Sequence, residues 1–226
     1  MLTVFSVGFR RTSTTSFPQH SEATNLLRIE NIHRSLNAAQ PDDTGPVANA
    51  RHAAVAAILR PNAESTEALF ILRATKDGDP WSGQMAFPGG HYEPRDGSLR
   101  VTAERETQEE IGLDLVRDAK YLGKIPDVKA NPRGQNIEMI VSPYIYVLEN
   151  PNPTIALNYE VAEVLWGSLN DMYSGESVTR HNFSVFGREQ AFPGYSVGDQ
   201  VVWGLTLRML DHFFTMLDPQ WQPRYE

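Results

Sequence analysis

The alternation of apolar and polar residues divides the chain into short segments that predict both helices and strands. Apolar residues at near-helical spacing predict three helices, over residues 22–37, 161–173 and 201–217. Shorter apolar runs bounded by turn-forming residues predict strands, over residues 53–59, 68–72, 84–87, 121–128, 137–148 and 177–186. Helices and strands are therefore both expected to contribute to the core.

A fourth helix is predicted between residues 98 and 111, because boundary signals are present at both of its ends. Asp96 and Ser98 are residue types that cap helix N-termini, and Gly112 is placed to end the helix. Helices and strands are thus intermixed without a regular strand–helix period. This order predicts an α/β (α+β) fold in which a mixed sheet is sandwiched between helices.

The composition of the 226-residue chain fits one globular domain, which we place at residues 22–226. The longest apolar run, residues 53–59, is far shorter than the roughly 18 residues of a membrane-spanning helix, so no membrane partner is expected. The formal net charge of −8 disfavours binding to a nucleic-acid backbone, so no nucleic-acid partner is expected. The absence of cysteine excludes a thiolate metal site and a cysteine nucleophile.

Residues 1–21 differ from the rest of the chain. They contain no Asp or Glu, carry Arg10 and Arg11, and are rich in Ser and Thr, which is the composition of a transit peptide. The number of arginines is low, however, so we favour a short flexible tail and keep a transit segment as the alternative. The expected location is intracellular: cytoplasmic, or mitochondrial if the tail is a targeting signal.

Three carboxylates fall on one side of the fourth helix. Glu106, Glu109 and Glu110 are related as i, i+3 and i+4, which places them within an arc of roughly 100°. Such carboxylates repel one another unless water dilutes their charge or cations neutralise it. Mg²⁺ binds carboxylate oxygens and completes its coordination with water and substrate phosphates. The helix therefore predicts a seat for a metal-bound diphosphate, with a solvated acidic surface as the alternative.

Residues next to these carboxylates suit the same chemistry. Arg105 can bond to Glu109 or a neighbouring carboxylate and so fix its rotamer. Gly89 and Gly90 allow backbone conformations closed to other residues, and they let a backbone carbonyl approach a metal closely.

Taken together, these residues resemble the signature of the Nudix hydrolase family. The signature begins at Gly90, reaches Asp96 after five residues, and continues through residues 105–113. Asp96 stands where the family has Glu, and eight residues instead of seven separate it from Arg105. Thr107 stands where the family usually has an apolar residue.

Other segments are similar to one branch of that family, the coenzyme A diphosphatases. The lengthened signature with Asp96, the segment 83–90 and the Trp-Gly-Leu-Thr sequence at 203–206 all resemble this branch. The branch usually carries a Leu-Arg-x-His element just before its Gly-Gln, and residues 77–82 of this chain differ from it.

The resemblance implies a metal-dependent hydrolase with Mg²⁺ or Mn²⁺ as cofactor. Glu106 and Glu110 would be metal ligands, and Gly90 would add a backbone oxygen. Glu109 would be a further ligand or a water-orienting catalytic carboxylate, and Arg105 beside it would also belong to the catalytic residues. A mixed sheet between helices, as in an α/β/α sandwich, is the fold that the resemblance implies.

Residues outside the signature are candidates for further roles. In many family members a glutamate elsewhere completes the metal site or acts as the base; Glu138 is the first candidate here and Glu163 the second. Arg73 and Arg95 are candidates for binding phosphate oxygens, and Arg133 is a third candidate for a 3′-phosphate. The alternative for each of these residues is an ordinary surface position.

Two aromatic residues flank the glycine-rich loop. Trp81 and Phe87 are candidates for stacking on an adenine, although aromatic residues beside glycines more often belong to the core. His91 is expected to be a hydrogen-bonded loop residue, because carboxylates already suit Mg²⁺.

The predicted function is metal-dependent hydrolysis of a diphosphate bond in a small-molecule substrate. Coenzyme A or an acyl derivative is the leading substrate, with adenosine 3′,5′-bisphosphate and 4′-phosphopantetheine as products. Alternatives are another diphosphate (a dinucleotide, an ADP-sugar, an oxidised nucleotide or an isoprenyl diphosphate) or a non-catalytic binding module with the same fold. A homodimer is left open, because the sequence does not indicate the oligomeric state.

Overall fold

The computed structural model describes residues 24–39, 41, 45–47, 50–62, 65–78, 81–130, 139–185 and 188–225. The tail at residues 1–21 and two candidate residues, Glu138 and Arg133, lie outside these ranges, so their predicted roles remain predictions. The helices are α2 (Ile29–Ala39), α3 (Leu99–Ile111), α4 (Leu115–Asp118), α5 (Leu169–Ser174) and α6 (Gly204–Leu217), with a 3₁₀ turn at Pro94–Asp96. None of the described helices is long and apolar enough to cross a membrane.

The strands form one large sheet and one small one. In the large sheet the described strands are β1 (Arg51–Pro61), β2 (Thr66–Arg73), β3 (Met85–Ala86), β4 (Gly89–His91), β5 (Ala119–Lys124), β6 (Val128–Ala130), β7 (Met139–Leu148) and β8 (Val161–Ser168). The small sheet contains β9 (Val178–Val185), β10 (Arg188–Val197) and β11 (Gln200–Trp203).

Strand β1 lies at the centre of the large sheet and makes it mixed. It pairs in parallel with β7 along nine residues, and antiparallel with β2 and β4. The outer pairings are antiparallel: β8 with β2, and β5 and β6 with β7. Because both faces of β1 are covered, eight consecutive residues of this strand are buried. The mixed sheet predicted from the order of elements is therefore confirmed.

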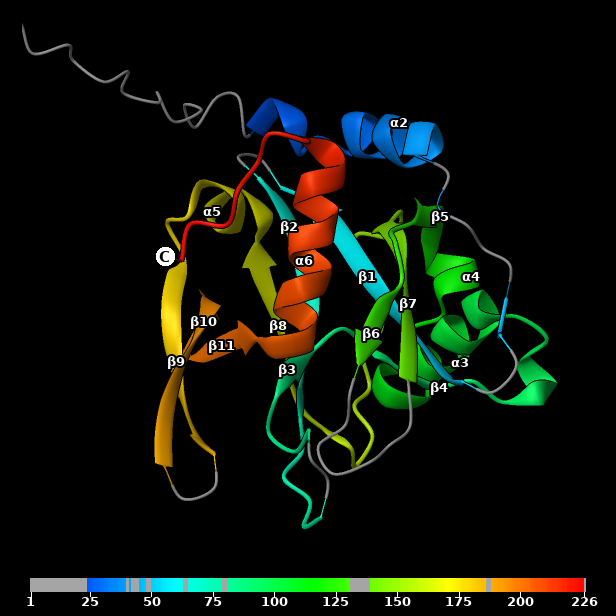
Figure 1. Ribbon diagram of the computed structural model, residues 1–226. Coiled ribbons are helices and arrows are strands. Elements are labelled where there is room, and N and C mark those ends of the chain that lie inside the picture. The colour runs from blue at the N-terminus through cyan, green and yellow to red at the C-terminus, as the bar shows by residue number, and fades with distance from the viewer. Residues whose placement is uncertain are drawn as a thin grey trace, which may run out of the picture.

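Helices cover both faces of this sheet. Helices α2 and α6 cover one face over a core that includes Leu36, Val141 and Phe213, whereas α3 covers the opposite face over Ala54, Ala103 and Tyr144. Figure 1 shows α6 in front of β1 and β2, with α3 and α4 behind the other side of the sheet. The sandwich of a mixed sheet between helices is thus the observed fold.

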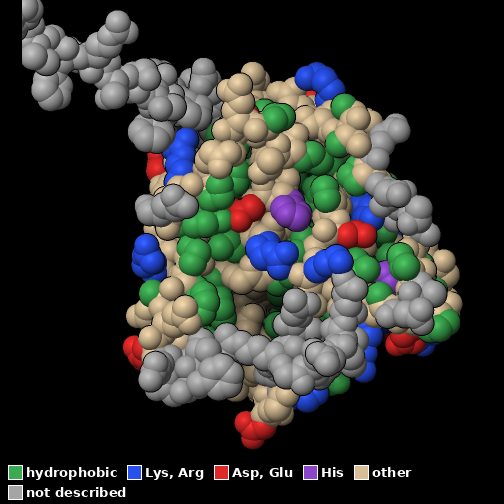
Figure 2. Space-filling view, in the orientation of Figure 1, with side chains coloured by type: hydrophobic (Ala, Val, Ile, Leu, Met, Phe, Trp, Pro, Cys, Tyr) green, Lys and Arg blue, Asp and Glu red, His purple; other side chains and the backbone are tan. Residues whose placement is uncertain are grey.

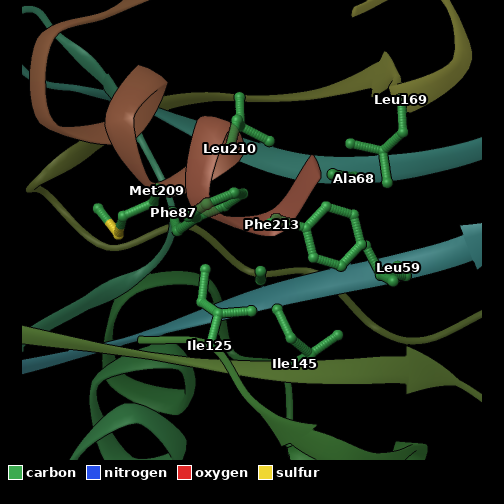
Figure 3. Close-up of a pocket in the computed structure, with 10 residues that line it drawn as sticks. Leu59, Ala68, Phe87, Ile125, Ile145, Leu169, Met209, Leu210 and Phe213 are labelled. Carbon is green, nitrogen blue, oxygen red and sulfur yellow. The ribbon is translucent and has the colours of Figure 1, made fainter. Parts of the chain in front are cut away.

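The core beneath α6 contains a small cavity. Figure 3 shows Leu210 and Phe213 of α6 facing Leu59, Ala68 and Ile145 of the sheet. The cavity encloses about 10 Å³ and its lining is apolar. A space of that size holds at most one water molecule, so it belongs to the packed core and is not a substrate site.

Several predicted elements differ from the structure. The helix predicted over residues 161–173 is wrong: residues 161–168 form β8, and only Leu169–Ser174 are helical. Periodicity does not separate a strand from a helix in a short apolar run, and here the edge of β2 supplies backbone partners for β8. The helix predicted over 201–217 begins at Gly204, because the preceding residues form β11. Strand β10 was not predicted.

The boundaries of α3 match those predicted. The side chain of Ser98 accepts a hydrogen bond from the Val101 amide, and Gly112 ends the helix with φ of 70°, a conformation that favours glycine. Asp96 does not cap α3; it ends the preceding 3₁₀ turn and accepts a hydrogen bond from the Glu93 amide. The helix is therefore held in register with the turn before it.

Candidate functional site

A cavity of about 500 Å³ opens beside helix α3, where the ends of several strands meet the start of α6. Its charged lining comes from Arg73, Glu93, Glu106, Glu110 and Glu160. The rest of the lining is mostly apolar and glycine-rich, and it includes Val55, Trp81, Met85, Phe87, Gly89, Gly90, His91, Met139, Val141, Leu205, Thr206 and Met209. The cavity thus joins a cluster of carboxylates to an apolar wall.

Glu110 is a buried carboxylate, only 2% exposed, in the last turn of α3. Its Oε2 accepts a hydrogen bond of 2.8 Å from the Gly89 amide, and the Arg73 Nη1 lies 3.9 Å from its Oε1. Burial raises the pKa of Glu110 to about 8, against the opposing effects of the Gly89 hydrogen bond and the Arg73 charge. The partners of Glu110 therefore do not offset its burial, so the neutral form is favoured near pH 7, and a bound cation would stabilise the charged form.

Glu106 lies one turn earlier and faces Gly90. A Cβ atom at position 90 would lie 2.5–2.7 Å from the Glu106 carboxylate, which is closer than real Cβ atoms come. A side chain at position 90 would therefore displace the Glu106 carboxylate, and glycine leaves the room that this carboxylate occupies. Burial raises the pKa of Glu106 as well, although Arg105 lies 2.9 Å away and opposes the shift.

Arg105 connects the helix to the loop before it. Its guanidinium makes a two-point ion pair with Asp96, with distances of 2.8 and 3.1 Å, and donates a hydrogen bond to the His91 carbonyl. Asp96 also accepts a hydrogen bond from the Thr102 hydroxyl. These bonds hold the pKa of Asp96 well below its usual range. Arg105 contacts Glu106 from outside the cavity lining, so its geometry is that of a positioning residue.

The third carboxylate of the predicted set points elsewhere. The Glu109 side chain is 50% exposed, is bonded to Arg105 at 3.0 Å, and is absent from the described lining of the cavity. Arg95 is 66% exposed and pairs with Glu93 at 2.8 Å. The structure therefore brings Glu106 and Glu110 into the cavity and leaves Glu109 and Arg95 on the surface beside it.

Two other candidates, Arg73 and Trp81, line the cavity, and both are half-buried. Phe87 lies deeper: it is buried, and its ring stacks on Phe70 with centroids 5.1 Å apart. One face of Phe87 is thus already covered by a core residue. Trp81 is the better placed of the two aromatic residues for contact with a substrate.

Glu160 is a site residue that the sequence reasoning missed. It lies in the segment before β8, lines the cavity, and its charge contributes to the raised pKa of Glu110. The second-ranked candidate, Glu163, is exposed on β8 and is not among the described lining residues. Because residues 161–173 were expected to form a helix, no sequence signal brought Glu160 toward α3.

The comparisons with known proteins agree with this geometry. The NUDIX domain family matches residues 50–185, which include β1, the glycine-rich loop and α3. The chain belongs to the NUDIX domain family. The family predicted from the sequence, the Nudix hydrolases, is therefore confirmed.

Several relatives of this Nudix protein are similar over part of their length. A mitochondrial coenzyme A diphosphatase of Mus musculus, NUDT8, is 27% identical over 152 residues, covering 67% of this chain and 70% of the mouse protein. A peroxisomal coenzyme A diphosphatase of Caenorhabditis elegans, ndx-8, is 34% identical over 90 residues, covering 39% and 36%. An uncharacterised Schizosaccharomyces pombe protein is 35% identical over 114 residues; the match spans half of this chain and 35% of the yeast protein.

Solved structures of the same family are also similar to this chain. The MutT/nudix family protein from Enterococcus faecalis is 17% identical, and the match covers 89% of this chain and 75% of that protein with a TM-score of 0.49.

Nudix hydrolases act on small-molecule diphosphates and generally use divalent metal ions. The residues of this Nudix site fit such an ion. Glu110 is buried and Glu106 is half-buried, both have raised pKa values, and Gly90 leaves room for close approach. Among the described residues, no three His, Asp or Glu side chains form a group that could hold a metal. Two carboxylates and a carbonyl completed by water and phosphate oxygens are a donor set that Mg²⁺ accepts.

The Trp-Gly-Leu-Thr sequence forms part of the cavity wall of the Nudix site. Thr206 is buried, and its hydroxyl donates a hydrogen bond of 3.1 Å to the Met85 carbonyl of β3. This bond anchors the first turn of α6 beside the glycine-rich loop and places Leu205 in the cavity lining. The segment therefore shapes the site although no charged group comes from it.

Proposed function

We propose that this Nudix hydrolase cleaves the diphosphate bond of coenzyme A or an acyl derivative, giving adenosine 3′,5′-bisphosphate and 4′-phosphopantetheine, with Mg²⁺ or Mn²⁺ as cofactor. The observation that carries the proposal is a pair of carboxylates, the half-buried Glu106 and the buried Glu110, in a cavity that also contains Arg73 and an apolar wall. This combination suits a substrate with a diphosphate and a long uncharged arm.

Three charged residues of the cavity, Arg73, Glu106 and Glu110, bind the cation or the diphosphate in this reaction. Glu106 and Glu110 hold the cation, and the Gly89 amide fixes the orientation of Glu110. Arg73 binds an oxygen of the diphosphate and faces the charge that develops on the leaving phosphate. The bound cation supplies charge neutralisation and activation of water.

The attacking water also needs a proton acceptor. Glu160 is our structural candidate, because it lines the cavity beside Arg73 and Glu110. Glu138 remains the candidate from the sequence. Replacing each by Gln and measuring kcat against pH distinguishes them, because loss of the base removes the acidic limb of the profile.

Three features support coenzyme A over other diphosphates. Two relatives are named coenzyme A diphosphatases. The segments 83–90 and 203–206, which resemble that branch, both line the cavity. Its apolar residues, Met139 and Val141 among them, fit a pantetheine arm or an acyl chain better than a second nucleotide.

The test is a comparison of substrates with purified full-length protein. Coenzyme A, octanoyl-coenzyme A, ADP-ribose, diadenosine tetraphosphate and an isoprenyl diphosphate are each assayed with Mg²⁺, with Mn²⁺ and with excess chelator. We expect kcat/KM to be highest for coenzyme A or its acyl form, and activity to disappear with chelator. Faster cleavage of another diphosphate would reassign the substrate, and undiminished turnover in chelator would remove the metal from the reaction.

A further inference from the structure

A second hollow continues from the catalytic cavity. It is lined by residues 73–78 together with Tyr159 and Glu160, and it shares Arg73 and Glu160 with the catalytic cavity. The two hollows therefore meet at Arg73, the residue that binds the diphosphate in the proposed function. A substrate bound at the carboxylates has room to extend in two directions.

The two directions differ in chemistry because they lie toward opposite sides of the sheet. Arg73 ends β2 and Glu160 precedes β8, which is the partner of β2 away from β1. Met139 and Val141 lie on β7, which is on the far side of β1 from β2. The β8 side is thus polar and open, whereas the β7 side is apolar and continues under α6.

The second hollow presents an aromatic ring and a cation. Tyr159 is 83% exposed, and Lys76 is exposed on the same hollow. The segment that carries Tyr159 is fixed on both sides: the Asn158 amide donates to the Glu110 carbonyl at 2.9 Å, and the Ala74 amide donates to the Glu160 carbonyl at 2.8 Å. The backbone that carries Tyr159 is therefore held close to the catalytic helix.

Charge assigns a role to the lysine. In the described lining of both hollows, Arg73 and Lys76 are the Lys or Arg residues, whereas the acidic residues of the second hollow are Asp77 and Glu160. With Arg73 facing the diphosphate, Lys76 is the cation placed to meet a further phosphate on the nucleotide. Arg95, a candidate from the sequence, pairs with Glu93 and lies outside both linings.

We propose that the hollow formed by residues 73–78 and Tyr159 binds the nucleotide half of the substrate, with Tyr159 stacking on the purine and Lys76 binding the 3′-phosphate, while the pantetheine or acyl half lies against Leu205, Met139 and Val141. This assignment rests on the proposed function. It orients the bound substrate across the sheet, with the nucleotide half on the β8 side and the pantetheine or acyl half on the β7 side. Aromatic stacking and a charge-assisted contact to phosphate are the ordinary means of binding such a nucleotide.

Product inhibition of the full-length enzyme separates the two halves of the site. Adenosine 3′,5′-bisphosphate reports on the nucleotide end and 4′-phosphopantetheine on the apolar end. We expect Lys76→Gln to raise the inhibition constant of the bisphosphate about tenfold and to leave that of 4′-phosphopantetheine unchanged. Leu205→Gln should do the reverse. Lys120→Gln, at an exposed lysine of β5, is the control and should change neither constant.

Turnover gives a second readout. Lys76→Gln should lower kcat/KM for coenzyme A about tenfold, mainly through KM, and leave 3′-dephospho-coenzyme A unaffected. Tyr159→Ala should raise KM for both substrates by a similar factor, and Tyr159→Phe should restore it. Wild-type protein that cleaves neither substrate would remove the proposed function. A different result would overturn only this assignment: the wild type cleaves coenzyme A, and Lys76→Gln keeps the wild-type preference for coenzyme A over 3′-dephospho-coenzyme A.

Discussion

The two ends of helix α3 hold buried carboxylates in opposite electrostatic states. At the N-terminal end, Asp96 is saturated by a two-point ion pair with Arg105 and a hydrogen bond from Thr102, and its pKa lies well below the usual range. At the C-terminal end, Glu110 has one amide hydrogen bond and a guanidinium 3.9 Å away, and its pKa is raised to about 8.

This difference indicates that the two carboxylates, Asp96 and Glu110, have different roles within one motif. A buried carboxylate whose lone pairs are all used stabilises the fold and has little left for a ligand. A buried carboxylate with too few partners favours its neutral form until a cation arrives, and such perturbed groups in a cavity are typical of functional sites. The first carboxylate of the motif, Asp96, therefore stabilises the fold, and the last, Glu110, is the one we propose as a metal ligand.

Glu110→Gln gives the largest expected effect. It removes the negative charge that holds the cation while keeping the size of the side chain, so we expect kcat to fall on the order of a thousandfold. The fold should persist, because Gln has the size of Glu and Glu110 is already largely neutral near pH 7 in the metal-free folded state. Steady-state kinetics at saturating Mg²⁺ measure the loss, with circular dichroism as a control. Near wild-type kcat would show that both ends of α3 are structural.

The affinity for the cation should depend steeply on pH. A proton competes with the metal for Glu110 below pH 8, so the affinity for Mn²⁺ should rise about fiftyfold between pH 6 and pH 8 and level off above. Calorimetric titration of metal-free protein with Mn²⁺ in several buffers measures this, together with the proton released. A flat profile for the wild type would contradict the raised pKa.

The same pKa sets the sign of a stability effect in metal-free protein. The unfolded chain releases the Glu110 proton near pH 4.5, whereas the folded state keeps it to about pH 8. Between these values the folded state binds more protons, so the contribution of Glu110 to stability falls as pH rises. The contribution of Asp96 has the opposite sign: it is present above the ordinary Asp pKa and is lost as pH falls through the lowered folded value.

Asp96→Asn tests the structural end of the comparison. Breaking a pair whose side chains are 2% and 16% exposed should cost about 2 kcal/mol, or about 30-fold in the unfolding equilibrium. Activity of the folded fraction should change far less than in Glu110→Gln. Urea unfolding measures the cost, and Asp199→Asn, at an exposed turn, serves as the control. A loss of kcat with unchanged stability would reverse the roles of the two ends.

Glu109→Gln gives the smallest expected effect. The side chain is half-exposed and its bond to Arg105 is a surface ion pair, which contributes little. We expect kcat/KM to fall less than threefold. A loss of a hundredfold or more would mean that the third carboxylate of α3 enters the site when substrate binds.

The order of burial among the three glutamates follows from helical geometry that the sequence contains. At about 100° per residue, Glu110 lies about 20° from the buried Ala103 around the helix, Glu106 about 60° and Glu109 about 120°. The exposed fractions of the three side chains rise in the same order, 3%, 18% and 50%. The caps Ser98 and Gly112 are likewise local signals, and the structure confirms them.

The sequence by itself determined the family, the mixed fold, the helix with its capped ends and the identity of the carboxylates, because these depend on local spacing and residue type. Only the tertiary structure decided which side chains from distant segments lie next to these carboxylates. Glu160 reaches Glu110 because residues 161–168 pair with the edge of β2 instead of forming a helix. Phe87 joins the core because Phe70 lies beneath it. Such contacts depend on strand pairing between segments far apart in the chain, which no local pattern encodes.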